Sequence, residues 1–187
     1  GCETALVSTA KELDRASAIV LPGVGAFEQG MADLRGKDLI EPIFKRVKED
    51  GVPLIGICLG MQLLGDDSEE MGHFNGLGLI PGSIVRLETT RKDYRIPNFG
   101  WHAATPSRAG VMFPETATEK SFYFAHSYHF RCKDPKDVAA TIDFSDQPIT
   151  VAVERGNVFG VQFHPEKSQD AGPDVLARFG SHVRERG

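Results

Sequence analysis

Cysteine and long apolar stretches are both scarce in this sequence. Its 187 residues include three cysteines, Cys2, Cys58 and Cys132, whose wide spacing fits neither a disulfide framework nor a zinc site. No apolar run approaches the ~20 residues that a bilayer-spanning helix needs, and residues 1–9 lack the basic and apolar stretches of a signal peptide. We therefore expect a cytoplasmic protein with reduced thiols, no bound metal and no membrane contact.

The charge pattern also excludes classes of protein. The formal net charge is −5 and no basic stripe stands out, so we expect no nucleic-acid partner. Hydrophobic residues make up 41% and charged residues 25%, which is ordinary for a globular chain. The length suffices for one domain with a sizeable core.

The first half of the sequence alternates apolar strands with helices. Residues 18–21 form a short apolar run ended by Pro22-Gly23, which predicts a buried strand and then a turn. Apolar residues between positions 39 and 47 fall on one helical face, and residues 53–57 predict the next buried strand. We expect a helix to begin directly after that strand, over residues 59–64.

The second half is rich in short β runs. These runs are residues 84–87, 122–124, 138–142, 150–153 and 158–163. Gly156-Asn157 separates the last two and is typical of a hairpin turn, and an amphipathic helix follows Pro173. We therefore predict a single α/β domain over residues 1–187, with a mostly parallel central sheet flanked by helices and an additional antiparallel β portion.

Cys58 occupies a sharp turn between a predicted strand and a predicted helix. In the segment Gly56-Ile57-Cys58-Leu59-Gly60, glycines stand two residues before and after the cysteine, as around a nucleophile on such a turn. Small neighbours are needed because the backbone there is strained and crowded. The adjacent helix N-terminus is expected to lower the thiol pKa. The alternative is a buried structural cysteine.

His164 is the candidate general base. It follows the apolar run at residues 158–163, and functional groups of α/β proteins gather at such strand ends. Pro165 biases His164 towards an extended backbone, and Glu166 is two residues further on, where its carboxylate can orient the imidazole. The alternative, for any single histidine, is a packing or surface role.

Pro22-Gly23-Val24-Gly25 is a candidate oxyanion loop. Its glycines would let backbone N–H groups approach a substrate carbonyl closely. A phosphate-binding loop is the competing interpretation, but Glu28 replaces the third glycine of that motif, and we predict no cofactor. A plain turn is the remaining alternative.

Five segments together resemble the class I (triad) glutamine amidotransferases. They are Pro22-Gly-Val-Gly-Ala-Phe27, Gly56-Ile-Cys-Leu-Gly-Met-Gln62, Pro97-Asn-Phe-Gly-Trp101, Phe124-Ala-His-Ser-Tyr128 and Phe163-His-Pro-Glu-Lys-Ser168. Within that family the segments are similar to those of glutaminase subunits of imidazole glycerol phosphate synthase. The resemblance implies release of ammonia from glutamine for a (β/α)8 cyclase partner, with which the chain forms a heterodimer, in histidine biosynthesis.

The resemblance also implies a role for each matching residue. The catalytic residues would be Cys58 as nucleophile, His164 as base and Glu166 as the residue that orients the base. The oxyanion would be held at Val24, Gly25 and Leu59. Glutamine would be bound by Gln62, Glu70, Ser127 and Tyr128. The partner would be contacted by Asn98, Trp101, Tyr123 and Lys167.

The sequence departs from the family at its start. The family opens with a strand and an Asp-Tyr-Gly-x-Gly-Asn type loop, neither of which is found here, so we expect a domain that lacks the family's first strand and helix. Three other functions remain open: a glutaminase subunit of another amidotransferase, a stand-alone γ-glutamyl cysteine hydrolase, and a non-catalytic binding subunit.

Overall fold

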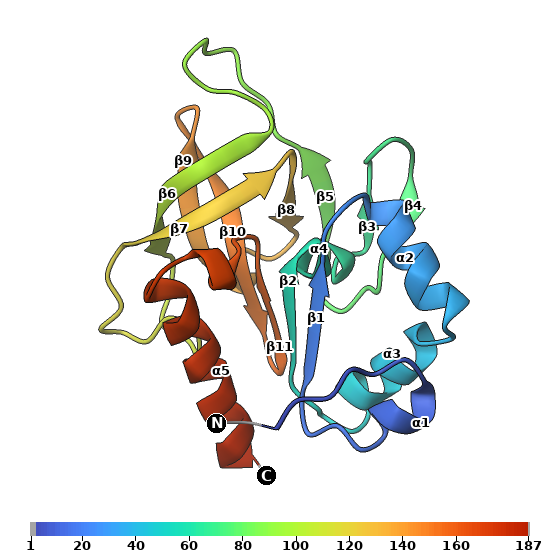
Figure 1. The fold of residues 1–187 in the computed structure, drawn as a ribbon. Coiled ribbons are helices and arrows are strands. Elements are labelled where there is room, and N and C mark those ends of the chain that lie inside the picture. The colour runs from blue at the N-terminus through green and yellow to red at the C-terminus, as the bar shows by residue number, and fades with distance from the viewer. Residues whose placement is uncertain (1–2, 187) are drawn as a thin grey trace.

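The computed structural model describes residues 3–186, whose strands form one curled sheet covered by helices (Figure 1). The strands are β1 (Ile19–Gly23), β2 (Leu54–Cys58), β3 (Asp67–Ser68), β4 (Phe74–Asn75), β5 (Gly82–Arg86), β6 (Asn98–Pro106), β7 (Lys120–His126), β8 (Tyr128–Cys132), β9 (Val138–Phe144), β10 (Gln147–Arg155) and β11 (Val158–Val161). The helices are α1 (Ala10–Leu13), α2 (Phe27–Gly36), α3 (Ile40–Lys48), α4 (Leu59–Leu63) and α5 (Ala171–Arg186), with 3-10 turns η1 (Pro135–Asp137) and η2 (Pro165–Lys167).

The centre of the sheet is parallel and its extension is antiparallel. The main strand order is β1-β2-β11-β10-β8-β5-β3-β4. β2 is parallel to both of its neighbours, β1 and β11, whereas β10 is antiparallel to β11, β8 and β9. β6 pairs with β7 along its length and with β9 at its end, so the sheet curls over there (Figure 1). This arrangement confirms the predicted fold class.

Successive residues of the central strands point into two separate apolar cores. Leu54 of β2 belongs to a core with Phe27 of α2 and Val47 of α3, whereas the next residue, Ile55, belongs to a core with Phe179 of α5. Helices α2 and α3 thus cover one face of the parallel strands and α5 covers the other (Figure 1). Within residues 3–186, no helix combines the length and apolar character needed to cross a bilayer.

The predicted turn at Pro22-Gly23 is wrong, because β1 continues through both residues. A proline inside a strand is tolerated where no ladder hydrogen bond is required of it, and β1 lies at an edge of the described sheet. The chain turns immediately afterwards, at Val24 and Gly25, where Gly25 has a φ of 101°. The predicted hairpin turn at Gly156-Asn157 is confirmed, since Arg155 pairs with Val158 across it.

Helix α2 and strand β6 are among the elements that lie where the sequence analysis predicts none. Helix α2 contains Gly30 and ends at Gly36, which weakens its helix propensity, although Phe27, Met31 and Leu34 have helical spacing and are buried. Strand β6 contains Gly100 and few β-branched residues, and it is held by its pairing with β7. Both elements matter to the site, because α2 follows the candidate oxyanion loop and β6 carries Asn98 and Trp101.

Candidate active site

Cys58 is held in a rare backbone conformation between β2 and α4. Its φ of 55° and ψ of −110° are costly for a residue with a side chain. A side-chain carbon added at Gly56 would lie 2.5 Å from the Gly60 carbonyl oxygen, and one added at Gly60 would overlap the Leu21 carbonyl. These close approaches confirm that glycine is needed on both sides of the cysteine.

The Cys58 thiol is buried, and burial raises its pKa above the ordinary value. Hydrogen bonds from the Leu59 backbone and the Gln162 side chain act in the opposite direction, but they are outweighed. The expectation that the helix N-terminus lowers the thiol pKa is therefore wrong for the net shift, because desolvation exceeds the contribution of the N–H groups. Cys58 and Cys132 are free thiols, and Cys2 lies outside the described residues.

His164 lies just beyond β11, next to the strand that carries Cys58. β11 and β2 are parallel neighbours with Val161 opposite Ile57, so their carboxyl ends meet at the same edge. His164 is buried, and its Nδ1 lies 3.0 Å from Oε1 of the exposed Glu166. An ionised carboxylate only accepts, so Nδ1 donates and Nε2 of the neutral ring carries no proton. The role of His164 as base stays a prediction. In the described chain no hydrogen bond joins this ring to the Cys58 sulfur, and such contacts often tighten only when substrate binds.

Ser168 fixes the backbone of His164, a role that the sequence analysis does not assign. Its Oγ donates to the His164 carbonyl oxygen at 2.6 Å and accepts the Tyr123 N–H at 3.0 Å. The His164 N–H donates in turn to the Tyr123 carbonyl oxygen at 2.9 Å. His164 is therefore tied to β7 through its backbone. Ser168 ends the segment Phe163-His-Pro-Glu-Lys-Ser168, but its role could not be predicted because its hydrogen bonds reach β7, a strand distant in the sequence.

The candidate oxyanion loop adjoins Cys58. β1 and β2 are in register with Gly23 opposite Cys58, so Val24 and Gly25 leave the sheet beside the thiol. The φ of 101° at Gly25 is one that glycine alone adopts readily, and the Val24 side chain is 79% exposed. The role of Val24, Gly25 and the Leu59 amide in holding an oxyanion stays a prediction.

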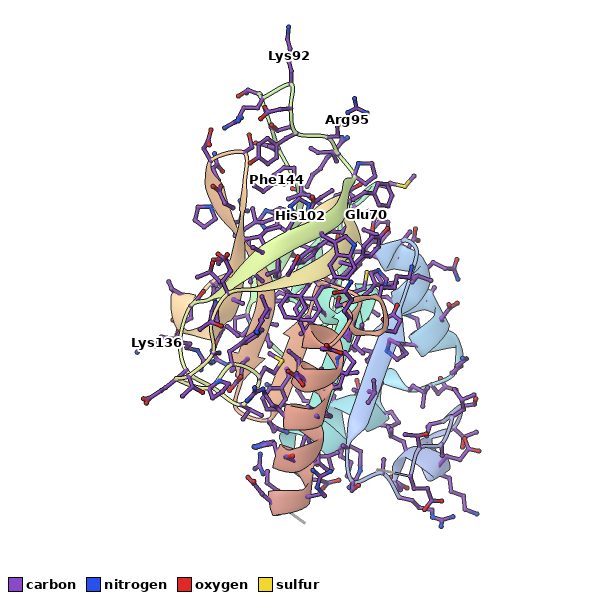
Figure 2. The ribbon with its side chains drawn as sticks, turned by 60° about the vertical axis from the view of Figure 1, so that its left-hand side comes forward. Glu70, Lys92, Arg95, His102, Lys136 and Phe144 are labelled. Carbon is purple, nitrogen blue, oxygen red and sulfur yellow. The ribbon has the colours of Figure 1, made fainter. Side chains whose placement is uncertain are left out.

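The four candidate glutamine-binding residues lie in two groups. The Gln62 side-chain nitrogen donates to the Tyr128 carbonyl oxygen at 3.1 Å, and Ser127 precedes Tyr128 between β7 and β8. Glu70 lies beside the start of α2, where its carboxylate accepts the Phe27 N–H at 2.7 Å (Figure 2). Glu70 therefore stands next to the loop of residues 24–26, and its role in binding glutamine also stays a prediction.

Three of the four candidate partner-contacting residues form one cluster beside His164. The rings of Trp101 and Tyr123 meet edge to face with centroids 6.0 Å apart, and the Lys167 ammonium lies 5.5 Å from the Tyr123 centroid. The Tyr123 ring is itself 6.4 Å from the His164 ring. We call Trp101, Tyr123 and Lys167 the aromatic face. Trp101 is 45% exposed, so this face is open to a partner.

Asn98 does not belong to the aromatic face. Its side chain is 3% exposed, and its Nδ2 lies 3.1 Å from Nε2 of His126. Side chains alternate along a strand, so Asn98 points away from the exposed Phe99 and Trp101. The Asn98 side chain is therefore buried behind that face, and its contact with a partner stays a prediction.

A cysteine on a strained strand-to-helix turn, beside a histidine–carboxylate pair at the carboxyl ends of parallel strands, defines an α/β protein suited to cysteine-dependent acyl transfer. The chain belongs to the class-I glutamine amidotransferase family, whose model matches residues 2–183.

Curated relatives agree with this family. "Imidazole glycerol phosphate synthase subunit HisH" of Moorella thermoacetica is 44% identical over 176 residues, which are 94% of this chain and 81% of the relative. The protein of the same description from Chlorobaculum tepidum is 38% identical over 179 residues, 96% of this chain and 88% of the relative.

Among solved structures, a crystal structure of glutamine amidotransferase has a TM-score of 0.69 at 21% identity, covering 93% of this chain and 85% of its own. The glutaminase domain of Trypanosoma brucei CTPS with bound acivicin has a TM-score of 0.60 at 17% identity, covering 94% of this chain and 74% of its own. At these identities the two structures support the fold alone.

Proposed function

We propose that this chain is the glutaminase subunit of an imidazole glycerol phosphate synthase, hydrolysing glutamine to glutamate and ammonia for a (β/α)8 cyclase partner. The observation that carries the proposal is the continuity of the site. Cys58 ends β2, His164 lies just beyond the neighbouring β11, and Tyr123 links His164 to the exposed Trp101. Relatives that are synthase subunits by description support the identity of the partner.

The residues suggest a two-step amide hydrolysis. The Cys58 sulfur attacks the side-chain carbonyl carbon of glutamine, and the carbonyl electrons move onto the oxygen, near the amides of Gly25 and Leu59. His164 takes the thiol proton and returns it to the nitrogen as the C–N bond breaks, which releases ammonia. Water, deprotonated by His164, then attacks the thioester, releases glutamate and restores the thiol. Glu166 keeps Nδ1 protonated and stabilises the imidazolium.

The position of the aromatic face suggests that the partner controls this reaction. A subunit docked on Trp101 and Lys167 would cover the site from the side of His164, so ammonia could pass to it without entering water. Hydrolysis without a partner would waste glutamine. We therefore expect glutaminase turnover to rise strongly when the partner and its nucleotide ligand are both bound.

The test is glutamate formation by the purified chain alone, with the cyclase partner, and with the partner and its nucleotide ligand. The proposal predicts slow turnover alone and the fastest turnover in the full complex. Equal turnover with and without partner would overturn the coupling and favour a stand-alone γ-glutamyl hydrolase. Stimulation only by a different synthase would favour another amidotransferase subunit.

A further inference from the structure

We propose that Gln162 is a positioning residue for the Cys58 sulfur, a role that rests on the proposed function of Cys58 as nucleophile. Gln162 lies directly after β11 and is fully buried. Its Nε2 donates to the Cys58 sulfur at 3.8 Å, a distance suited to a large sulfur acceptor. An N–H group aimed at sulfur stabilises the thiolate more than the thiol and fixes the direction in which the sulfur points.

The orientation of the Gln162 amide is fixed by Gln62. The Gln62 nitrogen donates at 3.1 Å to the Tyr128 carbonyl oxygen, which can only accept. The same nitrogen donates at 3.0 Å to the side-chain oxygen of Gln162. Reversing the Gln162 amide would set two donors against each other at this point and would turn its oxygen towards the sulfur. The Gln162 nitrogen therefore faces Cys58.

Gln62 and Gln162 form the inner end of a longer buried network of hydrogen bonds. The Tyr128 carbonyl oxygen also accepts a hydrogen bond from Nδ1 of His126 at 2.8 Å. Because Nδ1 of the neutral ring carries the proton, Nε2 accepts a hydrogen bond from Nδ2 of Asn98 at 3.1 Å. Burial lowers the pKa of His126 to about 4, which keeps the ring neutral. This hydrogen-bond network thus runs from β6, behind the aromatic face, to the Cys58 sulfur. The low local dielectric strengthens each hydrogen bond in it.

The alternative is that Gln162 only fills space. An apolar side chain of similar volume would fill a fully buried position without needing hydrogen-bond partners. Gln162 instead uses its oxygen on Gln62 and its nitrogen on Cys58. Burial raises the pKa of the Cys58 thiol, and the Gln162 N–H is one of the groups that counteract it. Removing this donor should therefore change the ionisation of the Cys58 thiol. If Gln162 only filled space, its replacement by an apolar side chain of similar volume would leave that ionisation unchanged.

The experiment measures the rate of Cys58 alkylation by iodoacetamide against pH, read from the peptide that contains Cys58 by mass spectrometry. It compares the wild-type chain with Gln162→Met and with Gln147→Met, the same change at an exposed position of β10. We expect Gln162→Met to raise the midpoint of the alkylation rate against pH by about one pH unit. We also expect it to lower kcat for glutamine hydrolysis about tenfold with little change in KM. Gln147→Met should match the wild type in both measurements.

An unchanged midpoint in folded Gln162→Met would overturn the proposal. If circular dichroism shows that this variant does not fold, Gln62→Met replaces it, because that change releases the Gln162 amide and leaves the donor in place. The midpoint should then rise by a smaller amount, and no rise would overturn the proposal. The alkylation profile needs neither glutamine nor partner. Absence of glutaminase turnover in the wild-type complex would therefore overturn the proposed function alone.

Discussion

Nδ1 of His164 lies 3.0 Å from Oε1 of Glu166, and only Pro165 separates the two residues in the chain. The histidine is buried and the glutamate is exposed, so the pair joins the interior of the site to its surface. Ser168 and Tyr123 hold the backbone of the histidine, which leaves the carboxylate as the group that selects the tautomer of the ring.

Replacing Glu166 tests this relationship. Glu166→Gln keeps the shape of the side chain but removes the charge that stabilises the imidazolium, so kcat should fall by about tenfold to a hundredfold with little change in KM. Steady-state glutaminase kinetics in the complex measure the effect. The exposed Glu115→Gln is the control and should retain wild-type kcat. A wild-type kcat in Glu166→Gln would show that the carboxylate does not orient the base.

The crowding at Gly56 predicts a loss of stability. Gly56→Ala places a methyl group 2.5 Å from the Gly60 carbonyl oxygen, which should lower the free energy of unfolding by about 1–3 kcal/mol and reduce activity by moving Cys58. Gly36→Ala, at the end of α2 with open space around the added carbon, should be neutral or slightly stabilising. Urea unfolding measures both variants, and equal stabilities would contradict the steric account.

The position of the aromatic face predicts that binding of the partner can be weakened without loss of reactivity at Cys58. Trp101→Ala should weaken binding of the cyclase partner by about tenfold or more, because exposed aromatic residues often dominate interfaces. Labelling of Cys58 by a glutamine-like electrophile should persist in the isolated variant. Phe44→Ala, at a similarly exposed aromatic residue on α3, should bind normally. Isothermal titration gives the affinities, and normal binding by Trp101→Ala would remove this face from the interface.

The buried His126 predicts a dependence of stability on pH. Burial lowers its pKa from 6.5 to about 4, so between these values the unfolded chain binds a proton that the folded chain does not. The free energy of unfolding should therefore fall as the pH drops through this range, by at most about 3 kcal/mol from this residue. Urea unfolding of His126→Gln should show a weaker loss on acidification than the wild type. An identical loss would show that His126 does not contribute.

Local patterns in the sequence predict the nucleophile turn and the histidine–glutamate pair because each lies within a few residues. The segment of residues 56–60 requires its glycines for steric reasons that act inside one strand-to-helix turn, and the structure bears this out at Gly56 and Gly60. The hairpin at Gly156 is similarly local. Such features depend on backbone geometry that neighbouring residues impose.

The remaining features depend on contacts between distant segments. Gln162 and Ser168 acquire their partners only when β11 lies beside β2 and near β7, so their own residue types carried no visible signal. The burial of Asn98 depends on the pairing of β6 with β7, which places its side chain against His126. The thiol pKa depends on burial by the whole fold, which the helix N-terminus alone does not reveal.

The most direct test of the account is the glutaminase rate of Cys58→Ala, measured in the complex beside Cys132→Ala. Burial raises the pKa of the Cys132 thiol to about 12, so that residue serves as an unreactive control. We expect Cys58→Ala to lose several orders of magnitude in kcat, while Cys132→Ala keeps its turnover. Turnover by Cys58→Ala at the wild-type rate would contradict it.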